Sequence, residues 1–278
     1  MKPKRIIYFN NEQYDEVVDF KNKDIKIDKD YKYIHSNLFY NFFSWLTYRI
    51  FATPIFWFYF KFITPVRYVN KRVLKDAKHT GYFIYGNHTN QFVDGVCPTF
   101  ICFPQKPHFI CTSANISIPF WGKLTKMWGA LPIPNTIEAT KNFHNAIEFV
   151  LKQHNPIIIY PEAHLWPYYT KIREFPTTSF RYPIKYNKPV FTFTTTYQKR
   201  MFFKKPKITI YVDGPFYHDK NLPEKQAQQE LRDAIFNIMN KRATNNTYEY
   251  IKYQKKEQQW LIFYLEATIK YLTEYFFA

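Results

Sequence analysis

Five short runs rich in β-forming residues, each bounded by Gly, Pro, Asn or Asp, dominate the middle of the chain. They are GYFIYGN (81–87), HFICTS (108–113), PIIIYPE (156–162), KPVFTFTTTY (188–197) and KITIYVDGP (207–215). Residues 136–153 lie between two of these runs and carry apolar side chains at helical spacing, from Ile137 to Leu151. Strands that alternate with helices favour an α/β fold, so we predict a mixed, largely parallel sheet flanked by helices.

A second region, residues 36–66, is aromatic and almost free of charge. Arg49 interrupts it near the middle, and Thr53-Pro54 is expected to break or kink a helix. A bilayer span needs about 20 consecutive apolar residues. We therefore expect two short helices, or a re-entrant hairpin, lying in a membrane interface. The aromatic residues that favour the headgroup level are Trp45, Tyr48, Trp57 and Tyr59. The alternative is a pair of helices buried in the core.

These patterns divide the chain into four parts. Residues 1–35 form a charged N-terminal arm, residues 36–66 the aromatic membrane-interface helices, and residues 67–222 an α/β domain. Residues 223–278 are predicted to form C-terminal helices that pack on the domain or on the membrane, the last of them over 260–277.

The chain has 278 residues and a formal charge of +17, so we expect an anionic partner: nucleic acid, an anionic lipid surface or a phosphorylated substrate. The sequence has no zinc-ligand spacing, basic zipper or aromatic RNA-binding motif, which disfavours nucleic acid. Three cysteines without CxxC spacing fit a reducing compartment, and the first residues lack the apolar core of a secretory signal. We therefore expect a peripheral or monotopic protein at the cytoplasmic face of the cell membrane.

The sequence FIYGNHTNQFVDG (83–95) ends a predicted strand and presents His88 and Asp94 on the loop or helical turn that follows. Sites of α/β enzymes gather at such strand ends. Histidine can take a proton from a hydroxyl near neutral pH, and a carboxylate beside it fixes its tautomer. We interpret the pair as a candidate general base with its orienting partner. The plainer alternative is that His88 caps a helix and Asp94 is a first-turn carboxylate.

Four blocks in order give this pair a context: NHTNQFVD (87–94), GALPIPNT (129–136), YPEAH (160–164) and KPVFTFTTTY (188–197). Over residues 80–215 the series resembles the glycerolipid acyltransferase family, whose best-known members acylate glycerol 3-phosphate or lysophosphatidate. The resemblance implies an O-acyltransferase in which His88 deprotonates the acceptor hydroxyl, Asp94 holds the imidazole and no covalent enzyme intermediate forms. It implies acyl-CoA, acyl carrier protein or acyl phosphate as the donor, and neither a cofactor nor a metal.

The resemblance also assigns binding residues. Glu162 matches the glutamate of the family's Pro-Glu-Gly block, which shapes the acceptor site, and Pro189 and Val190 match a later Pro-Val block beside the acyl chain. The chain departs from the family's pattern in its spacing, because five residues instead of four separate His88 from Asp94.

Two arginines that bind phosphate in the family are replaced here by Asn135 and Leu165, and Asn135 is expected to bind substrate at its position. Lys171 and Arg173 are candidate replacements, since arginine binds phosphate through two bonds and lysine as a point charge. The alternative for both is a solvated surface charge. His164 is expected to position the substrate.

Two other functions remain open. A basic, aromatic-rich protein that binds anionic lipid without catalysis would fit the longer His–Asp spacing and the replaced arginines. A metal-dependent hydrolase would use His88, Asp94, Glu162 and His164, although no HExxH-type spacing supports zinc.

Overall fold

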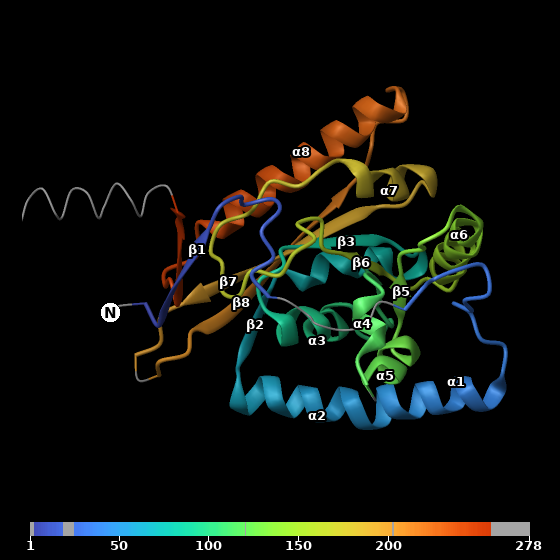
Figure 1. Cartoon of the computed structure of the whole chain (residues 1–278), viewed down its shortest axis with the longest axis horizontal. Coiled ribbons are helices and arrows are strands. Elements are labelled where there is room, and N and C mark those ends of the chain that lie inside the picture. Colours follow the sequence, from blue (N-terminus) through green and yellow to red (C-terminus); the bar gives the residue numbers. More distant parts are fainter. Residues whose placement is uncertain (1–2, 19–24, 120, 202, 257–278) are drawn as a thin grey trace, which may run out of the picture.

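The computed structural model describes residues 3–18, 25–119, 121–201 and 203–256 (Figure 1). Its centre is a seven-stranded sheet with the order β2-β8-β7-β3-β6-β4-β5. The strands are β2 (Val66–Val69), β3 (Phe83–Gly86), β4 (His108–Cys111), β5 (Ala130–Pro132), β6 (Ile157–Ile159), β7 (Val190–Gln198) and β8 (Lys207–Phe216). β8 runs antiparallel to β7, and the other neighbouring strands of this sheet pair in parallel. The predicted mixed, largely parallel sheet is therefore confirmed, and all five β-rich runs form strands.

Helices cover both faces of the sheet (Figure 1). One face carries α6 (Ile137–Lys152), α7 (Arg181–Lys185) and α8 (Glu224–Ala243), and the other carries α3 (Gln91–Ile101). In β3, Phe83 and Tyr85 join the core under α6 and α8, whereas Ile84 joins the core under α3. A strand that is buried on both sides has to be apolar along its whole length, which explains the FIY run. The shorter elements are η3 (Lys71–Leu74), η4 (Asp76–His79), α4 (Ala114–Ser117), α5 (Trp121–Met127) and η5 (Thr178–Phe180).

The aromatic segment forms one continuous helix, so the predicted two helices or hairpin are wrong. Its parts are α1 (Leu38–Trp45), η1 (Leu46–Ala52), α2 (Thr53–Phe58) and η2 (Tyr59–Ile63), with helical backbone angles at every junction. η1 and η2 are π-helical. The wide turn before Pro54 lets the Thr53 N–H and hydroxyl both bond to the Tyr48 carbonyl. Proline then lies at the start of α2, where its missing N–H is tolerated.

One side of this helix packs on the domain and the other is exposed. The Tyr48 hydroxyl lies 2.9 Å from the Thr99 hydroxyl of α3, and the Ser44 hydroxyl donates to the Met127 carbonyl (2.6 Å). The exposed apolar side chains include Leu38, Phe39, Phe42, Trp45, Phe51, Ile55, Trp57, Phe58, Phe62 and Ile63. The alternative of helices buried in the core is therefore wrong for this face. Within the described ranges we find no helix with the length and apolar character needed to cross a membrane.

The N-terminal arm and the end of the described chain lie side by side. β1 (Arg5–Phe9) pairs in parallel with β9 (Ile251–Lys255). α8 forms where the first C-terminal helix is predicted. The predicted last helix, 260–277, lies outside the described residues.

Gly86 at the end of β3 has no side chain, so the ring of Phe193 on the neighbouring strand β7 can pack directly against it. Substitution of Gly86 tests this packing. A Cβ at residue 86 would lie 2.3 Å from the Phe193 ring of β7. We expect Gly86→Ala to lower the free energy of unfolding by about 1–3 kcal/mol, because the paired strands β3 and β7 cannot easily move apart to make room for the added methyl group. The control is Gly95→Ala in α3, where a Cβ would meet nothing within 4 Å. Denaturant unfolding should show that this change is neutral or raises stability by up to about 1 kcal/mol; equal effects would contradict the packing.

Candidate active site

The structure brings His88 and Asp94 into contact. His88 lies just beyond β3, Asp94 lies in the first turn of α3, and His88 Nδ1 is 2.9 Å from Asp94 Oδ2. The Asp94 side chain is 1% exposed and the His88 side chain is 23% exposed. The imidazole is therefore the accessible member of the pair, and the carboxylate is buried behind it.

Backbone amides place the carboxylate. The N–H groups of Thr89 and Asn90 donate to the same Asp94 Oδ2, at 2.8 and 2.9 Å. Asn90 is also the N-cap of α3, because its side-chain oxygen accepts from the Val93 N–H (3.2 Å). The loop between His88 and the helix thus turns both amides inward. This turn accommodates the five-residue spacing between the histidine and the aspartate.

The electrostatics of the pair fix the tautomer of His88. Burial raises the pKa of Asp94 above its ordinary value, while the donors from His88, Asn90 and Thr89 favour the charged form. A carboxylate oxygen that already accepts from two amides also accepts from the imidazole, so Nδ1 carries the proton. Nε2 is left with a lone pair that can take a proton from a hydroxyl.

β7 holds the His88 loop from the side. The Asn87 amide donates to the Thr195 carbonyl (3.1 Å) and accepts from the Thr195 N–H (2.8 Å). The hydroxyl of Tyr197 lies 2.8 Å from the Thr89 hydroxyl and donates to the Thr89 carbonyl (3.1 Å). Sequence reasoning assigned none of these contacts, since they join residues 108 positions apart.

Glu162, in the segment after β6, binds the backbone of the His88 loop. Its Oε2 accepts from the His88 N–H (3.2 Å) and from the Arg173 guanidinium (3.1 Å), and its Oε1 accepts from the Arg173 N–H (3.2 Å). Burial raises the pKa of Glu162, whereas Arg173 opposes this by favouring the carboxylate. Glu162 is 4% exposed, so it acts here on the His88 backbone.

Arg173 is not a surface charge. It is 1% exposed, its guanidinium pairs with Glu162 and donates to the His164 carbonyl, and the group lies 5.0 Å from the centre of the Trp166 ring. Lys171, two residues earlier, is exposed. The solvated-charge alternative is therefore wrong for Arg173, which sits in the core in an ion pair.

Two other predicted binding residues, His164 and Asn135, have partners in the N-terminal arm. The His164 ring faces Glu16 of the N-terminal arm, with 3.5 Å between Nδ1 and Oε1. The Asn135 side-chain oxygen accepts from the Ile27 N–H (2.8 Å), and the Asn135 backbone N–H donates to the Ile27 carbonyl (3.0 Å). Asn135 thus ties the arm to the domain.

Pro189 and Val190 lie at the start of β7. The Pro189 carbonyl accepts from the Phe83 N–H, and Val190 pairs with Phe83 and is fully buried. The His88 loop follows the other end of β3. The structure therefore does not bring these two residues to His88, because they mark the opposite end of two parallel strands.

Sequence reasoning missed Tyr160. It follows β6 directly, and its ring stacks on the His88 imidazole with 4.5 Å between centroids and 24° between planes. The only sequence signal was its place before Pro161-Glu162, at the end of a strand. That strand became a neighbour of β3 only in the folded sheet.

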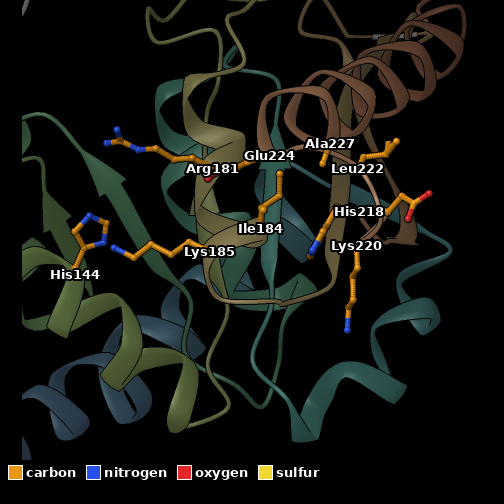
Figure 2. A pocket seen from close by; sticks show the side chains of 10 residues that line it. His144, Arg181, Ile184, Lys185, His218, Lys220, Leu222, Glu224 and Ala227 are labelled. Carbon is orange, nitrogen blue, oxygen red and sulfur yellow. The ribbon is translucent and has the colours of Figure 1, made fainter.

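A cavity of about 550 Å³ lies elsewhere (Figure 2). Its basic lining residues are His144, Arg181, Lys185, His218 and Lys220. α7 leads into the start of β7, and residues 218–220 follow β8 at the same edge, so this cavity is at the opposite end of the sheet from His88. In the part of the chain that the structure describes, no three His, Cys, Asp or Glu side chains are grouped to hold a metal ion, and the four residues of the hydrolase alternative do not form such a group.

The fold and the site define an α/β protein with a His–Asp pair at the carboxyl ends of parallel strands. A model of the acyltransferase family matches residues 66–205, half of the chain. The chain belongs to this family, and we describe it as an acyltransferase. Among solved structures it is similar to the crystal structure of the 1-acyl-sn-glycerophosphate (LPA) acyltransferase PlsC from Thermotoga maritima, with 15% identity, a TM-score of 0.46 and coverage of 64% of this chain and 72% of that chain. A comparison with curated proteins found no match.

Replacing Arg173 tests whether the Glu162 ion pair supports the site. We expect Arg173→Met to lower the free energy of unfolding by about 3–5 kcal/mol, because it leaves a buried carboxylate without its partner. Lys171→Met is the matched control and should change it by no more than about 0.5 kcal/mol. Adding Glu162→Gln to Arg173→Met should recover part of the loss in denaturant unfolding. A double variant as unstable as the sum of both single variants would contradict the pairing.

Proposed function

We propose that this acyltransferase moves a fatty acyl group from acyl-CoA, acyl carrier protein or acyl phosphate to a hydroxyl of a (lyso)glycerolipid-like acceptor. His88 is the general base and Asp94 orients it. The observation that carries the proposal is the 2.9 Å contact between His88 Nδ1 and a buried Asp94 carboxylate, with the imidazole partly exposed.

The reaction needs one proton carrier. Nε2 of His88 takes the acceptor's hydroxyl proton as the oxygen attacks the acyl carbonyl carbon. The new C–O bond forms, the bond to the donor's sulfur or phosphate oxygen breaks, and the donor leaves as thiolate or phosphate. The imidazolium then gives its proton to the departing thiolate or phosphate, which regenerates the neutral base. Asp94 stabilises the imidazolium through Nδ1 during this step.

The predicted phosphate ligands differ in their availability to an acceptor. Arg173 is buried in its ion pair with Glu162, and Asn135, although exposed, is uncharged and accepts from the Ile27 N–H through its side-chain oxygen. Lys171 is exposed, so it is the candidate cation for an acceptor phosphate. Its exposure supports this role.

We also propose that the helix from Leu38 to Ile63 docks on a membrane surface that contains anionic lipid. Its exposed apolar side chains support this, since such a face gains free energy in an interface. The Lys61 ammonium lies 4.5 Å from the centre of the Trp57 ring, a pairing suited to the headgroup level. Phe56 of α2 contacts Phe92 of α3 (5.5 Å between centroids). Phe92 lies two residues before Asp94, so a docked helix would present lipid close to the His88 site.

Removal of the base tests the reaction. We expect His88→Ala and Asp94→Asn each to lower kcat for acyl transfer on the order of 10²–10⁴-fold, because proton transfer loses its carrier or its orientation. Purified protein offered mixed acyl donors and lipid acceptors, with the products identified by mass spectrometry, provides the measurement. His79→Ala, at an exposed histidine of η4, is the control and should retain kcat within about a few-fold. Full activity in His88→Ala would overturn the assignment.

Membrane docking is tested on the exposed face. A triple variant, Phe51→Ser, Ile55→Ser and Phe58→Ser, should weaken binding to phosphatidylglycerol-containing vesicles by about 10-fold or more, because less apolar surface enters the interface. The control triple variant removes exposed apolar side chains elsewhere: Phe149→Ser, Met201→Ser and Tyr217→Ser. Vesicle co-sedimentation compares the two. Equal weakening would show that the helix is not the docking surface.

A further inference from the structure

Tyr160 contacts both members of the His–Asp pair. Its ring stacks on the His88 imidazole at 4.5 Å, and its hydroxyl donates to the Asp94 backbone carbonyl at 2.5 Å. The Tyr160 ring also packs in a T-shaped arrangement against Phe193 of β7, with 5.9 Å between centroids and 85° between planes. One side chain thus connects the imidazole, the first turn of α3 and the sheet.

The bond to Asp94 restrains the plane of the His88 ring only loosely. A hydrogen bond tolerates a deviation of about 30° from linearity, and rotation about the Cβ–Cγ bond of a histidine has a broad energy minimum. Rotation of the ring turns the lone pair of Nε2 away from the direction in which it must meet the hydroxyl. A flat ring stacked against one face restricts this rotation.

We propose that Tyr160 is a positioning residue that holds the plane of the His88 imidazole for proton transfer. This inference rests on the proposed function of His88 as the general base. Tyr160 acts through His88 and does not itself exchange a proton with the substrate. It also favours the step in which His88 becomes an imidazolium, because a cation over the face of an aromatic ring is stabilised more than a neutral group.

The surroundings of Tyr160 fit a fixed donor. Burial raises the pKa of its hydroxyl well above the ordinary value, and the negative charge of Asp94 acts in the same direction. The hydroxyl therefore keeps its proton and its bond to the Asp94 carbonyl. Gly86 leaves room for this arrangement, since a side chain there would collide with the Phe193 ring that packs against Tyr160.

Kinetics of two variants separate the ring from the hydroxyl. Tyr160→Leu removes both contacts and should lower kcat by about 10- to 100-fold with the KM of the donor nearly unchanged, because a small misplacement of a catalytic atom slows the chemical step. Tyr160→Phe keeps the stacked ring and should stay within about a few-fold of the unaltered protein. Phe191→Leu and Tyr82→Phe are matched controls in the same core, since neither residue contacts His88.

NMR provides a readout that needs no turnover. In protein labelled with ¹⁵N-histidine, the Nδ1–H signal of His88, assigned through His88→Ala, should be sharp in the unaltered protein and in Tyr160→Phe. It should broaden or vanish in Tyr160→Leu as the ring gains freedom. If the unaltered protein transfers no acyl group, the proposed function fails, and this signal still decides whether Tyr160 holds the ring.

Three results would overturn the inference. One is an unchanged His88 signal in Tyr160→Leu, whatever happens to kcat. Another is a kcat in Tyr160→Phe as low as in Tyr160→Leu, which would show that the hydroxyl causes the effect. The third is an equal loss of kcat in Phe191→Leu, which would show that general core packing causes it. If Tyr160→Leu does not fold, Tyr160→Met replaces it in the same comparisons.

Discussion

The buried carboxylate of Asp94 is the interaction on which the site depends. One of its oxygens accepts hydrogen bonds from the amides of Thr89 and Asn90 and from the imidazole of His88. A buried charge without such donors would be strongly unfavourable, so the loop that supplies them cannot relax without a large loss of stability. The direction of His88 is therefore set by the backbone geometry between β3 and α3. The imidazole stays accessible because the polar groups that fix it lie behind it.

Neighbouring strands complete this arrangement. β3, β6 and β7 run in parallel, so the residues after β3 and β6 meet at one edge of the sheet, beside the last residues of β7. β6 contributes Tyr160 against the ring of His88 and Glu162 against its backbone, and β7 contributes Tyr197 against Thr89. The buried Arg173 balances the charge of Glu162. Each contact constrains a different part of the same loop.

The two unusual surfaces of the molecule lie in different places. The exposed apolar face follows the helix from Leu38 to Ile63, which contacts α3 through Phe56 and Phe92 near the His–Asp pair. The cavity of about 550 Å³ drawn in Figure 2, which has both basic and acidic lining residues, lies at the opposite end of the sheet from His88. In the docking that we propose, a substrate that is partly embedded in lipid approaches from the helix side. The overall charge of +17 then supplies the attraction to an anionic surface, and the exposed apolar face of the helix orients the protein on it.

Residue patterns alone predict the α/β class, the five strands, α6 and α8, and the pairing of His88 with Asp94, because periodicity and short spacing depend on near neighbours. Features that depend on distant partners arise only in the folded chain. A π turn kept the helix intact at Pro54, Arg173 became a buried counter-ion in place of a phosphate ligand, and Tyr160 came to lie on His88 only when β6 paired beside β3. Charge, exposure and stacking depend on which groups meet in space, and the spacing of residues along a chain does not contain that information.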